Sequence, residues 1–326
     1  MREATEFAVA LAAIFVVAFT ATYVTVPWLR RALIRARIVE KDVHKPGFPE
    51  IPTMGGLGIF AGVAAALTIS GILNLEYRFL FAIFLSATLA ALAGLIDDLF
   101  KLSKSALVAL TFLISLPVIA FQAGTTLVYL TPVGPRDLGW FFWLLVPFAF
   151  AFLMNGVNIY AGFNGLEAGL GFISSLSLGI CAMIYGSWES AASLLALAGS
   201  LLSFLRWNWF PAKIFIGNTG TFLIGGVIAA SIIAGTIKLA GVIALFPYIA
   251  NFMLRVRDRF TCTVADVEMF PDGTLKNRKL TALWALFIRK SPATETNVVT
   301  HCLLIQIVFG LIAITFSYNH VGLIAH

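Results

Sequence analysis

The sequence predicts an all-α polytopic membrane protein of about ten transmembrane helices, with a small cytosolic appendage between the ninth and tenth. Two observations predict this class. The 326 residues are 60% hydrophobic and only 12% charged, whereas soluble chains are about a quarter charged. Apolar runs of the roughly 20 residues that a helix needs to cross the hydrocarbon core also recur along the chain. We therefore expect one membrane domain over residues 1–326.

The ten expected spans are separated by short polar connections, apart from one long loop near the C-terminus. They cover residues 4–29, 55–73, 79–96, 105–123, 139–160, 168–186, 190–206, 219–236, 238–254 and 298–317.

Basic residues are divided unequally between the two sets of loops. The odd-numbered loops and the flanking Arg206 hold 18 of the 22 Lys and Arg residues. Since Lys and Arg in short loops stay cytoplasmic, the odd loops are predicted to be cytosolic and both termini outside. The protein would then be an integral protein of the plasma membrane in a prokaryote, or of the endoplasmic reticulum in a eukaryote.

The net charge of +6 does not predict nucleic-acid binding, because the basic residues form no stripe interleaved with aromatic residues. Anionic lipid head groups and phosphorylated substrates are the expected partners.

Two loops carry signals of local structure. Residues 124–137 combine glycines and prolines around a β-prone run, which predicts a small hairpin on the outer side. The last cytosolic loop, 255–297, contains the turn sequence Pro271-Asp272-Gly273 and forms the predicted appendage. Within it, the apolar run Leu280–Ile288 precedes two basic residues and suits a helix lying in the membrane interface.

Asp97 and Asp98 are adjacent carboxylates at the end of the third apolar run, with Lys101 and Lys104 shortly after them. Paired acids beside bases can hold a divalent cation or accept a proton. A solvated helix end would show a similar pattern, and the spacing alone does not separate the two interpretations. Their position at a membrane surface favours a functional role.

Residues 155–169 hold three amides, a glutamate and several glycines between two apolar helices. Asn155 and Asn158 are three positions apart, so on a helix their amides share one face. Gly162 suits the end of that helix. Asn164 and Glu167 have the spacing of an N-cap and its reciprocal partner at the start of the next one. A simple turn would need fewer polar residues.

The segment Phe215–Gly220 leads into the eighth span, with Asn218 or Thr219 as the expected N-cap. A helix that begins with small residues presents free backbone N–H groups and suits a phosphate, although an ordinary cap has the same pattern. Likewise, Lys45-Pro46 and Pro52–Gly56 could form only a loop and a tight helix entry. All these motifs lie on odd loops, however, and so on one membrane face. Together they predict a site for a metal-bound diphosphate next to lipid.

With these residues in view, the chain resembles the polyprenyl-phosphate N-acetylhexosamine-1-phosphate transferase superfamily over nearly its whole length. Pro52-Thr53-Met54-Gly55-Gly56 resembles the helix entry of the bacterial peptidoglycan branch, and Asp97-Asp98 matches the paired aspartates of the superfamily. The stretch Asn158–Gly169 is close to the signature of the eukaryotic and archaeal enzyme that starts N-glycan assembly on dolichyl phosphate. Thr296-Asn297 and Leu304–Gln306 also resemble that branch.

The resemblance implies transfer of N-acetylglucosamine-1-phosphate from UDP-N-acetylglucosamine (UDP-GlcNAc) to dolichyl or another polyprenyl phosphate, with release of UMP. It implies a divalent cation, Mg²⁺ or Mn²⁺, as cofactor and membrane lipid as a partner. A homodimer is compatible with the sequence, which does not reveal the oligomeric state. The implied roles are as follows: Asp97 and Asp98 catalytic; Asn158 and Asn218 metal ligands; Phe215 and Asn164 uracil contacts; Asn155 and Glu167 organisers of the nucleotide-sugar loop; Lys45 and Lys104 phosphate contacts.

The chain departs from the family pattern at two places. Most members have an aspartate, a metal ligand, where this chain has Asn218; its amide can offer oxygen but no negative charge. The last cytosolic loop also lacks a clear match to the family's sugar-pocket motif. Arg255, Arg257 and Arg259 are candidates for diphosphate contacts there, and topology determinants are an equal alternative.

Other functions remain open from the sequence. A transporter of nucleotide sugars or lipids would also be polytopic, but its polar groups should lie near the bilayer midplane, whereas here they lie at span ends. An inactive scaffold or regulator descended from the enzyme is a third alternative, which the Asn218 departure leaves open. A transferase for another polyprenyl-linked polymer is the fourth.

Overall fold

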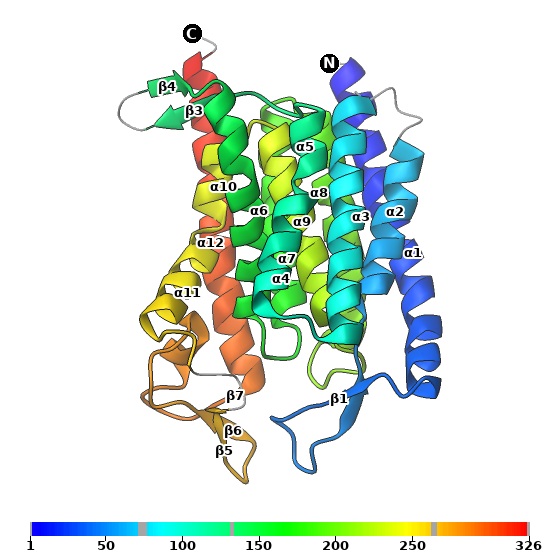
Figure 1. Cartoon of the computed structure of the whole chain (residues 1–326), viewed down its shortest axis with the longest axis vertical. Helices are drawn as coiled ribbons and strands as arrows, with labels where there is room; N and C mark the ends of the chain where they lie inside the picture. The colour runs from blue at the N-terminus through cyan, green and yellow to red at the C-terminus, as the bar shows by residue number, and fades with distance from the viewer. Residues whose placement is uncertain (1, 71–76, 131–133, 262–265, 325–326) are drawn as a thin grey trace.

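The computed structural model describes residues 2–70, 77–130, 134–261 and 266–324. Helices run alongside one another in a bundle whose two termini lie at the same end (Figure 1). The long helices are α1 (Arg2–Arg35), α3 (Tyr77–Phe100), α6 (Trp140–Tyr160), α7 (Leu166–Ile184), α8 (Trp188–Asn208), α9 (Gly217–Ala234) and α12 (Glu295–Ile324). The shorter ones are α2 (Gly56–Ser70), α4 (Lys104–Ile114), α5 (Leu116–Ala120), α10 (Lys238–Ala244) and α11 (Phe246–Arg257).

Each of the ten apolar segments predicted from the sequence overlaps one of these helices or an adjacent pair. Within the described ranges, seven helices are long and apolar enough to cross a membrane. The pair α10 and α11, bent by 61°, would make an eighth span. The segments at 55–73 and 105–123 form shorter apolar helices, and residues 71–73 lie outside the described part. A membrane protein with seven to eight candidate spans is therefore established.

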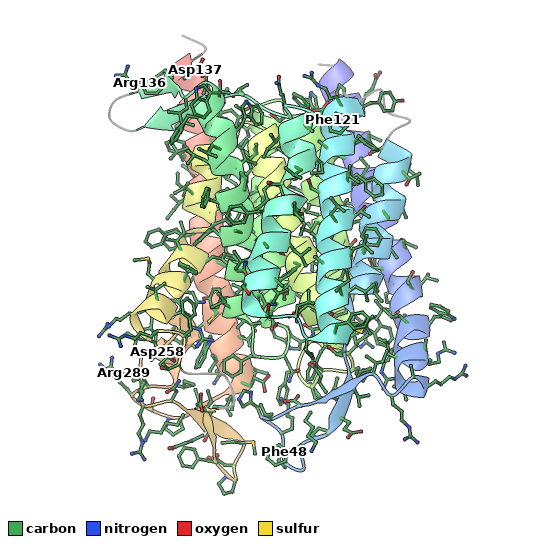
Figure 2. All side chains as sticks on the ribbon, viewed as in Figure 1. Phe48, Phe121, Arg136, Asp137, Asp258 and Arg289 are labelled. Carbon is green, nitrogen blue, oxygen red and sulfur yellow. The ribbon has the colours of Figure 1, made fainter. Side chains whose placement is uncertain are left out.

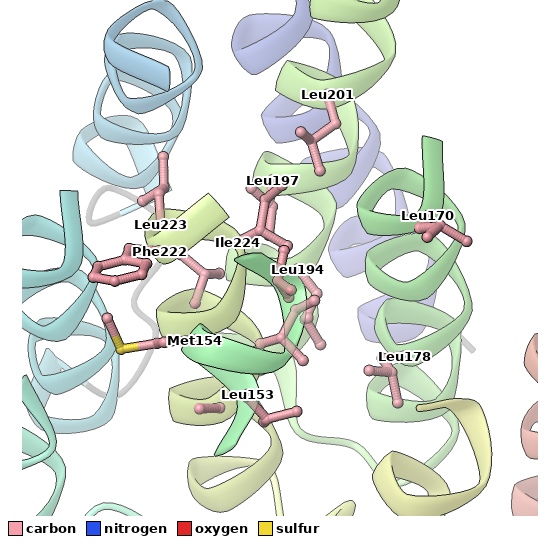
Figure 3. Packing of buried hydrophobic residues seen from close by; sticks show 14 of the residues in the cluster. Leu153, Met154, Leu170, Leu178, Leu194, Leu197, Leu201, Phe222, Leu223 and Ile224 are labelled. Atoms are coloured by element: carbon pink, nitrogen blue, oxygen red, sulfur yellow. The ribbon is translucent and has the colours of Figure 1, made fainter. Parts of the chain in front are cut away.

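Helix α9 lies at the centre of the bundle, and 89% of its 18 residues are buried. Figure 3 shows the side chains around it, which come from α6, α7, α8 and α9 itself: Leu153, Met154, Leu170, Leu178, Leu194, Leu197, Leu201, Phe222, Leu223 and Ile224.

Glycines allow two helices to approach the start of α9 closely. A Cβ at Gly94 of α3 would lie 2.3 Å from the backbone oxygen of Asn218, and one at Gly56 of α2 would lie 2.1 Å from the nitrogen of Gly220. No side chain fits at either contact. The approach of α3 places Asp97, one turn beyond Gly94, next to the first residues of α9.

Short strands occupy both ends of the bundle (Figure 1). At the end with the termini, β3 (Leu127–Leu130) pairs with β4 (Gly134–Asp137), which confirms the predicted hairpin; its turn at 131–133 is outside the described residues. At the other end, β1 (Val39–Lys41) pairs with β2 (Glu50–Pro52). There too, β5 (Glu268–Met269), β6 (Thr274–Lys276) and β7 (Ala293–Thr294) form a three-stranded sheet.

The helix predicted over Leu280–Ile288 is shorter and of another type than expected. The segment instead contains a five-residue 3-10 helix, η3 (Leu283–Phe287), in which Trp284 is fully buried. The backbone N–H of Leu283 donates to Oδ1 of the buried Asn251 in α11 over 2.9 Å. Leu283, Trp284 and Ala285 are buried against protein, whereas Leu286 is exposed.

Candidate functional site

Asp98 occupies the N-terminus of α9. Its Oδ1 accepts the backbone N–H of Asn218 over 2.8 Å. Its Oδ2 accepts the backbone N–H and the hydroxyl of Thr219 over 2.9 and 2.6 Å. The helix begins at Gly217, and its N-cap residue Ile216 makes no side-chain cap bond, so the expected cap by Asn218 or Thr219 is wrong. A carboxylate from α3 takes the place at the positive helix end where the sequence suggested a phosphate, because either anion suits it.

This arrangement predicts a structural cost for the loss of Asp98. Asp98→Ala would leave three donors without their acceptor, and we expect the free energy of unfolding to fall by about 1–3 kcal/mol. The melting temperature in detergent measures it. Asp272→Ala is the matched control, because Asp272 also accepts the N–H and hydroxyl of a threonine, Thr274, but is exposed. Equal melting temperatures for both variants would contradict the capping role.

Asp97, Asn218 and Asn158 form a continuous hydrogen-bonded chain. The amide group of Asn218 donates to Oδ2 of Asp97 over 2.6 Å, and its oxygen accepts the amide of Asn158 over 2.6 Å. Asn158 also donates to the hydroxyl of Thr221 over 3.1 Å. The second oxygen of Asp97 accepts the backbone N–H of Leu102 over 2.9 Å. Side chains from α3, α6 and α9 thus converge on one point.

Backbone pairing fixes the segment that precedes α9. The N–H groups of Gly55 and Gly56 donate to the carbonyls of Phe215 and Ile216, each over 2.8 Å, and the N–H of Phe215 donates to the carbonyl of Pro52 over 2.8 Å. The two glycine-containing motifs at 52–56 and 215–220 are therefore docked against each other. Phe215 is left half-buried beside Asn218.

A cavity of about 500 Å³ opens next to this chain. Its lining comes from four loops and the helix ends beside them, all at the end of the bundle opposite the termini (Figure 1). Six of the predicted site residues line it: Asn158, Asn164, Glu167, Phe215, Asn218 and Arg255. Asp97 is not part of the lining and lies behind Asn218, with 6% of its surface exposed.

A buried charge cluster lies beside the cavity, and its two acids, Asp42 and Glu295, line it. Lys45 pairs with Glu295 over 2.5 Å and with Asp42 over 3.3 Å, and all three side chains are nearly buried. Glu295 also accepts the backbone N–H of Asn164 over 2.6 Å, and Asp42 accepts the amide of the Asn164 side chain over 3.0 Å. The β1–β2 loop, the α6–α7 loop and the first residue of α12 are thereby tied together.

Asn164 is the polar group in this wall whose hydrogen bonds are incomplete. Its side chain is 5% exposed and lines the cavity, yet its Oδ1 has no hydrogen-bond partner among the described residues. A buried acceptor left unpaired costs about 1–3 kcal/mol. This oxygen is therefore suited to accept an N–H of a ligand.

The predicted capping box at the start of α7 is wrong. The N-cap is Gly165, whose φ of +83° is left-handed, and it makes no side-chain cap bond. Asn164 points to Asp42 instead. Glu167 does accept a loop N–H, from Gly162 over 2.9 Å, so it organises the α6–α7 loop by a bond that the sequence did not specify.

Two further predicted residues, Asn155 and Arg257, do not line the cavity. Asn155 donates to the carbonyl of Ala151 in its own helix over 2.8 Å. Arg257 is exposed and lines a second cavity. Lys104 begins α4, but its side chain lies outside the described part of the chain.

Lys45 faces its two acidic partners and the ring of Phe210, 4.4 Å from the nitrogen. It does not line the cavity.

Three residues of the site, Asp42, Thr221 and Glu295, were not predicted from the sequence. Thr221 follows Asn218 by three positions, a helical spacing that could have indicated it. No local signal marks Asp42 or Glu295, since their partners are distant in the sequence. His44 was also missed; it stacks on Phe163 with ring centres 5.2 Å apart.

The hydrogen-bonded chain contains three side chains whose oxygen atoms can bind a cation. Mg²⁺ in proteins is typically bound by one or two carboxylates together with substrate phosphates. One carboxylate, Asp97, and the amide oxygens of Asn158 and Asn218 fit such a site, which a substrate phosphate would complete. Over the described residues, no three His, Cys, Asp or Glu side chains come close enough to hold a metal by themselves.

Residues 80–236 match glycosyl transferase family 4. A protein of Saccharolobus solfataricus, provisionally named UDP-N-acetylglucosamine–dolichyl-phosphate N-acetylglucosaminephosphotransferase, is 36% identical over 250 residues, which is 75% of this chain and 77% of the relative. A protein of Sulfolobus acidocaldarius with the same provisional name is 30% identical over 315 residues, 93% of this chain and 94% of the relative. A phospho-N-acetylmuramoyl-pentapeptide-transferase of Desulforamulus reducens is 32% identical over 236 residues, 66% of this chain and 70% of the relative.

Proposed function

Because the chain belongs to glycosyl transferase family 4 and is similar over most of its length to its archaeal GlcNAc-phosphotransferases, we propose that it transfers N-acetylglucosamine-1-phosphate from UDP-GlcNAc to dolichyl or another polyprenyl phosphate. UMP is released, and the lipid-linked product begins the assembly of an N-glycan precursor. The observation that carries this proposal is the series of hydrogen bonds that joins Asp97, Asn218 and Asn158. Asn158 and Asn218 line the same cavity as Asn164 and Phe215.

In the proposed reaction, an oxygen of the lipid phosphate attacks the β-phosphorus of UDP-GlcNAc. A new phosphorus–oxygen bond forms, the bond from the β-phosphorus to the oxygen bridging the two phosphates breaks, and UMP leaves with that oxygen. Such phosphoryl transfers depend mainly on positioning and on charge neutralisation.

Asp97 has the position and the free lone pairs to serve the lipid phosphate. Each of its oxygens accepts one hydrogen bond, and a carboxylate oxygen can accept two. It therefore can still take the proton of a monoanionic lipid phosphate or orient the attacking oxygen. The α3 residues Ile96, Leu99 and Phe100, next to the aspartates, are exposed, which offers the polyprenyl chain an apolar approach. Asp98 serves as a positioning residue through its cap on α9.

Asn164 and Phe215 are proposed to bind the uridine. The unpaired Oδ1 of Asn164 can accept the imide N–H of uracil, and the half-buried ring of Phe215 can stack on the base. Glu167 keeps the loop that carries Asn164 in place through Gly162. Arg255, 8% exposed in the cavity lining, is the predicted basic residue placed to contact the diphosphate.

We propose Mg²⁺, with Mn²⁺ as a substitute, as the cofactor. Asp97, Asn158 and Asn218 would hold it with oxygens of the diphosphate, and it would supply neutralisation of the charge that develops on the phosphates. The lining of the cavity supports this need, because it contains four acids (Glu40, Asp42, Glu167, Glu295) and, apart from His44, two bases (Lys41, Arg255). Protein cations alone would not neutralise a diphosphate there.

For the membrane arrangement, we propose ten spans, with both termini outside and the site in the cytosol. The positions of the termini support an even number of crossings, since both lie at the end opposite the sheet of residues 268–294 (Figure 1). That sheet and η3 would form the cytosolic appendage. The unequal distribution of Lys and Arg supports the orientation.

One assay tests the function. Purified protein receives radiolabelled UDP-GlcNAc, Mg²⁺ and a polyprenyl phosphate, and the label in a lipid extract is counted together with released UMP. Label in the lipid with equimolar UMP supports transfer. Flux of label into vesicles without lipid product would indicate a transporter, and the absence of both with every polyprenyl phosphate would indicate a scaffold.

Glu295 provides a second test of the site. Glu295→Gln removes the charge opposite Lys45 and places an amide beside it, and breaking a buried pair is strongly destabilising. Since Glu295 also holds the backbone of Asn164, we expect the KM for UDP-GlcNAc to rise about tenfold, roughly 1.4 kcal/mol, while kcat changes less. Glu268→Gln is the control, because its contact with Arg278 is 3.9 Å and exposed. An unchanged KM in Glu295→Gln would remove Glu295 from substrate positioning.

A further inference from the structure

A second cavity, of about 350 Å³, lies between the end of α11 and the sheet-bearing loop. Four cationic side chains and one acid line it: Arg257, Arg278, Lys279 and Arg289, with Asp258. Figure 2 shows Arg289 and Asp258 at the same end of the molecule, opposite Arg136 and Asp137. The transfer reaction proposed above uses neither this cavity nor Arg278, Lys279 or Arg289.

The fold brings these cations together through buried backbone contacts. The N–H of Asn277 donates to the carbonyl of Ile288 over 3.2 Å, which sets Arg278 and Lys279 beside Arg289. Oδ1 of Asn277 accepts the N–H of Lys279 over 3.0 Å and shapes this turn. Leu283 is bonded to Asn251 of α11, and this contact holds the whole loop against the helix that carries Arg257.

Helix dipoles and the contacts among the described residues account for only part of this charge, because four cationic side chains face one acid, Asp258. Arg257 lies in the last turn of α11, where a cation is favoured, but Arg278 and Lys279 end no helix. Arg278 approaches Glu268 at 3.9 Å with both side chains largely exposed, a contact of little energy. Like charges held together by a fold repel unless an anion lies between them.

The position of the cavity favours an anion at the edge of a membrane. Helix α11 belongs to the bent candidate span, and its Met253 and Val256 are exposed, as is Leu286 of η3. Apolar surface beside a basic cluster is the combination that binds a phosphate-bearing lipid head group while the acyl chains stay in the bilayer.

We propose that this second cavity is a binding site for a phosphate group, distinct from the transferase site and suited to the head group of an anionic membrane lipid. The proposal does not depend on the transfer reaction. A phosphate monoester free in solution has the same chemistry, so the experiment separates the two sources.

The test uses the full-length protein in detergent, with native mass spectrometry to measure the Kd of phosphatidylglycerol and of phosphatidylcholine. The variant Lys279→Gln with Arg289→Gln removes two cavity cations. Each Lys or Arg near a lipid surface contributes about fivefold to binding, so the Kd for phosphatidylglycerol should rise roughly 25-fold, with phosphatidylcholine unaffected. The control, Arg31→Gln with Arg35→Gln, removes two exposed cations at the same end of the bundle and should retain the bound lipid.

A second arm titrates inorganic phosphate into the protein in phosphatidylcholine nanodiscs by calorimetry. If the parent binds phosphate and the Lys279/Arg289 variant does not, the site exists and its ligand can be a soluble phosphate. Phosphatidylglycerol binding without phosphate binding would support the lipid source. An equal loss of binding in the Arg31/Arg35 control would show that diffuse surface charge binds the ligand, and this would overturn the proposal. Unchanged binding in the Lys279/Arg289 variant would also overturn it.

Discussion

Asp97→Asn is expected to lower kcat for the labelling of polyprenyl phosphate by about 10³-fold, within the range of general acid–base effects. Asparagine has nearly the shape of aspartate, and its oxygen can still accept the N–H of Leu102, the bond that Asp97 makes over 2.9 Å. What it lacks is the negative charge and the lone pairs that would receive the proton of the lipid phosphate. The loss should therefore be chemical, with the KM for UDP-GlcNAc changed much less.

The melting temperature distinguishes this outcome from misfolding. Asp97→Asn places an amide next to the amide of Asn218, so one hydrogen bond is lost and a modest fall in melting temperature is expected. Asp272→Asn, at an exposed turn, is the control for the handling of an aspartate-to-asparagine change. Full lipid labelling by Asp97→Asn would remove this residue from the mechanism. A large fall in the melting temperature would show that Asp97 is needed for the fold and would leave its chemical role unsupported.

The helices were predictable from the sequence because lipid imposes a simple rule. A segment in the hydrocarbon core must satisfy its backbone bonds internally and present apolar side chains, so each of the ten apolar runs contains helix. Span length was less predictable. The run at 238–254 is divided by a 61° bend between α10 and α11, and the run at 280–288 is apolar because it packs against protein.

The sequence predicted which residues of the site lie at the same membrane face. It did not predict the direction in which each side chain points. Asn158 and Asn218 meet across 60 positions, as expected for motifs on loops of one side. Asn155 shares the helix face of Asn158 but lies one turn deeper, where its amide bonds to Ala151. Arg255 and Arg257 are two positions apart, about 200° around a helix, so Arg255 reaches the cavity and Arg257 does not.

The buried cluster shows a further limit. Glu295 is 250 positions from its partner Lys45, and its neighbours in the sequence carry no motif for an ion pair. A pair of this kind is evident only when the loops are placed in space. The same holds for Asp98, whose two oxygens accept three bonds at the start of α9, a role that its position beside Asp97 does not indicate.

Asn218→Asp is expected to increase the affinity for Mg²⁺ and to make the fold depend on it. The substitution keeps the acceptor for Asn158 but replaces the donor to Asp97, now at 2.6 Å, with a second carboxylate oxygen. Two unit charges about 4 Å apart repel by about 4 kcal/mol at an effective dielectric constant of 20. A proton or a divalent cation relieves such repulsion.

Two measurements follow from this charge change. Half-saturation of transfer should need about tenfold less Mg²⁺, with activity retained, because a carboxylate is the better ligand. The melting temperature should fall in chelator and recover with Mg²⁺, a response that does not depend on activity. If Asn218→Asp abolishes transfer while the parent is active, the assignment of position 218 as a ligand is wrong.

The double variant Asp97→Asn with Asn218→Asp separates charge from hydrogen bonding. It restores one amide and one carboxylate at the contact with the polarity exchanged, so the melting temperature in chelator should return close to that of the parent. Transfer should stay lost, since the carboxylate then lies on α9 and not beside the exposed end of α3. The coupling energy of this double-mutant cycle measures the Asp97–Asn218 contact directly. Recovered transfer would show that the site needs a carboxylate at either position, with no separate role for Asp97 as the base.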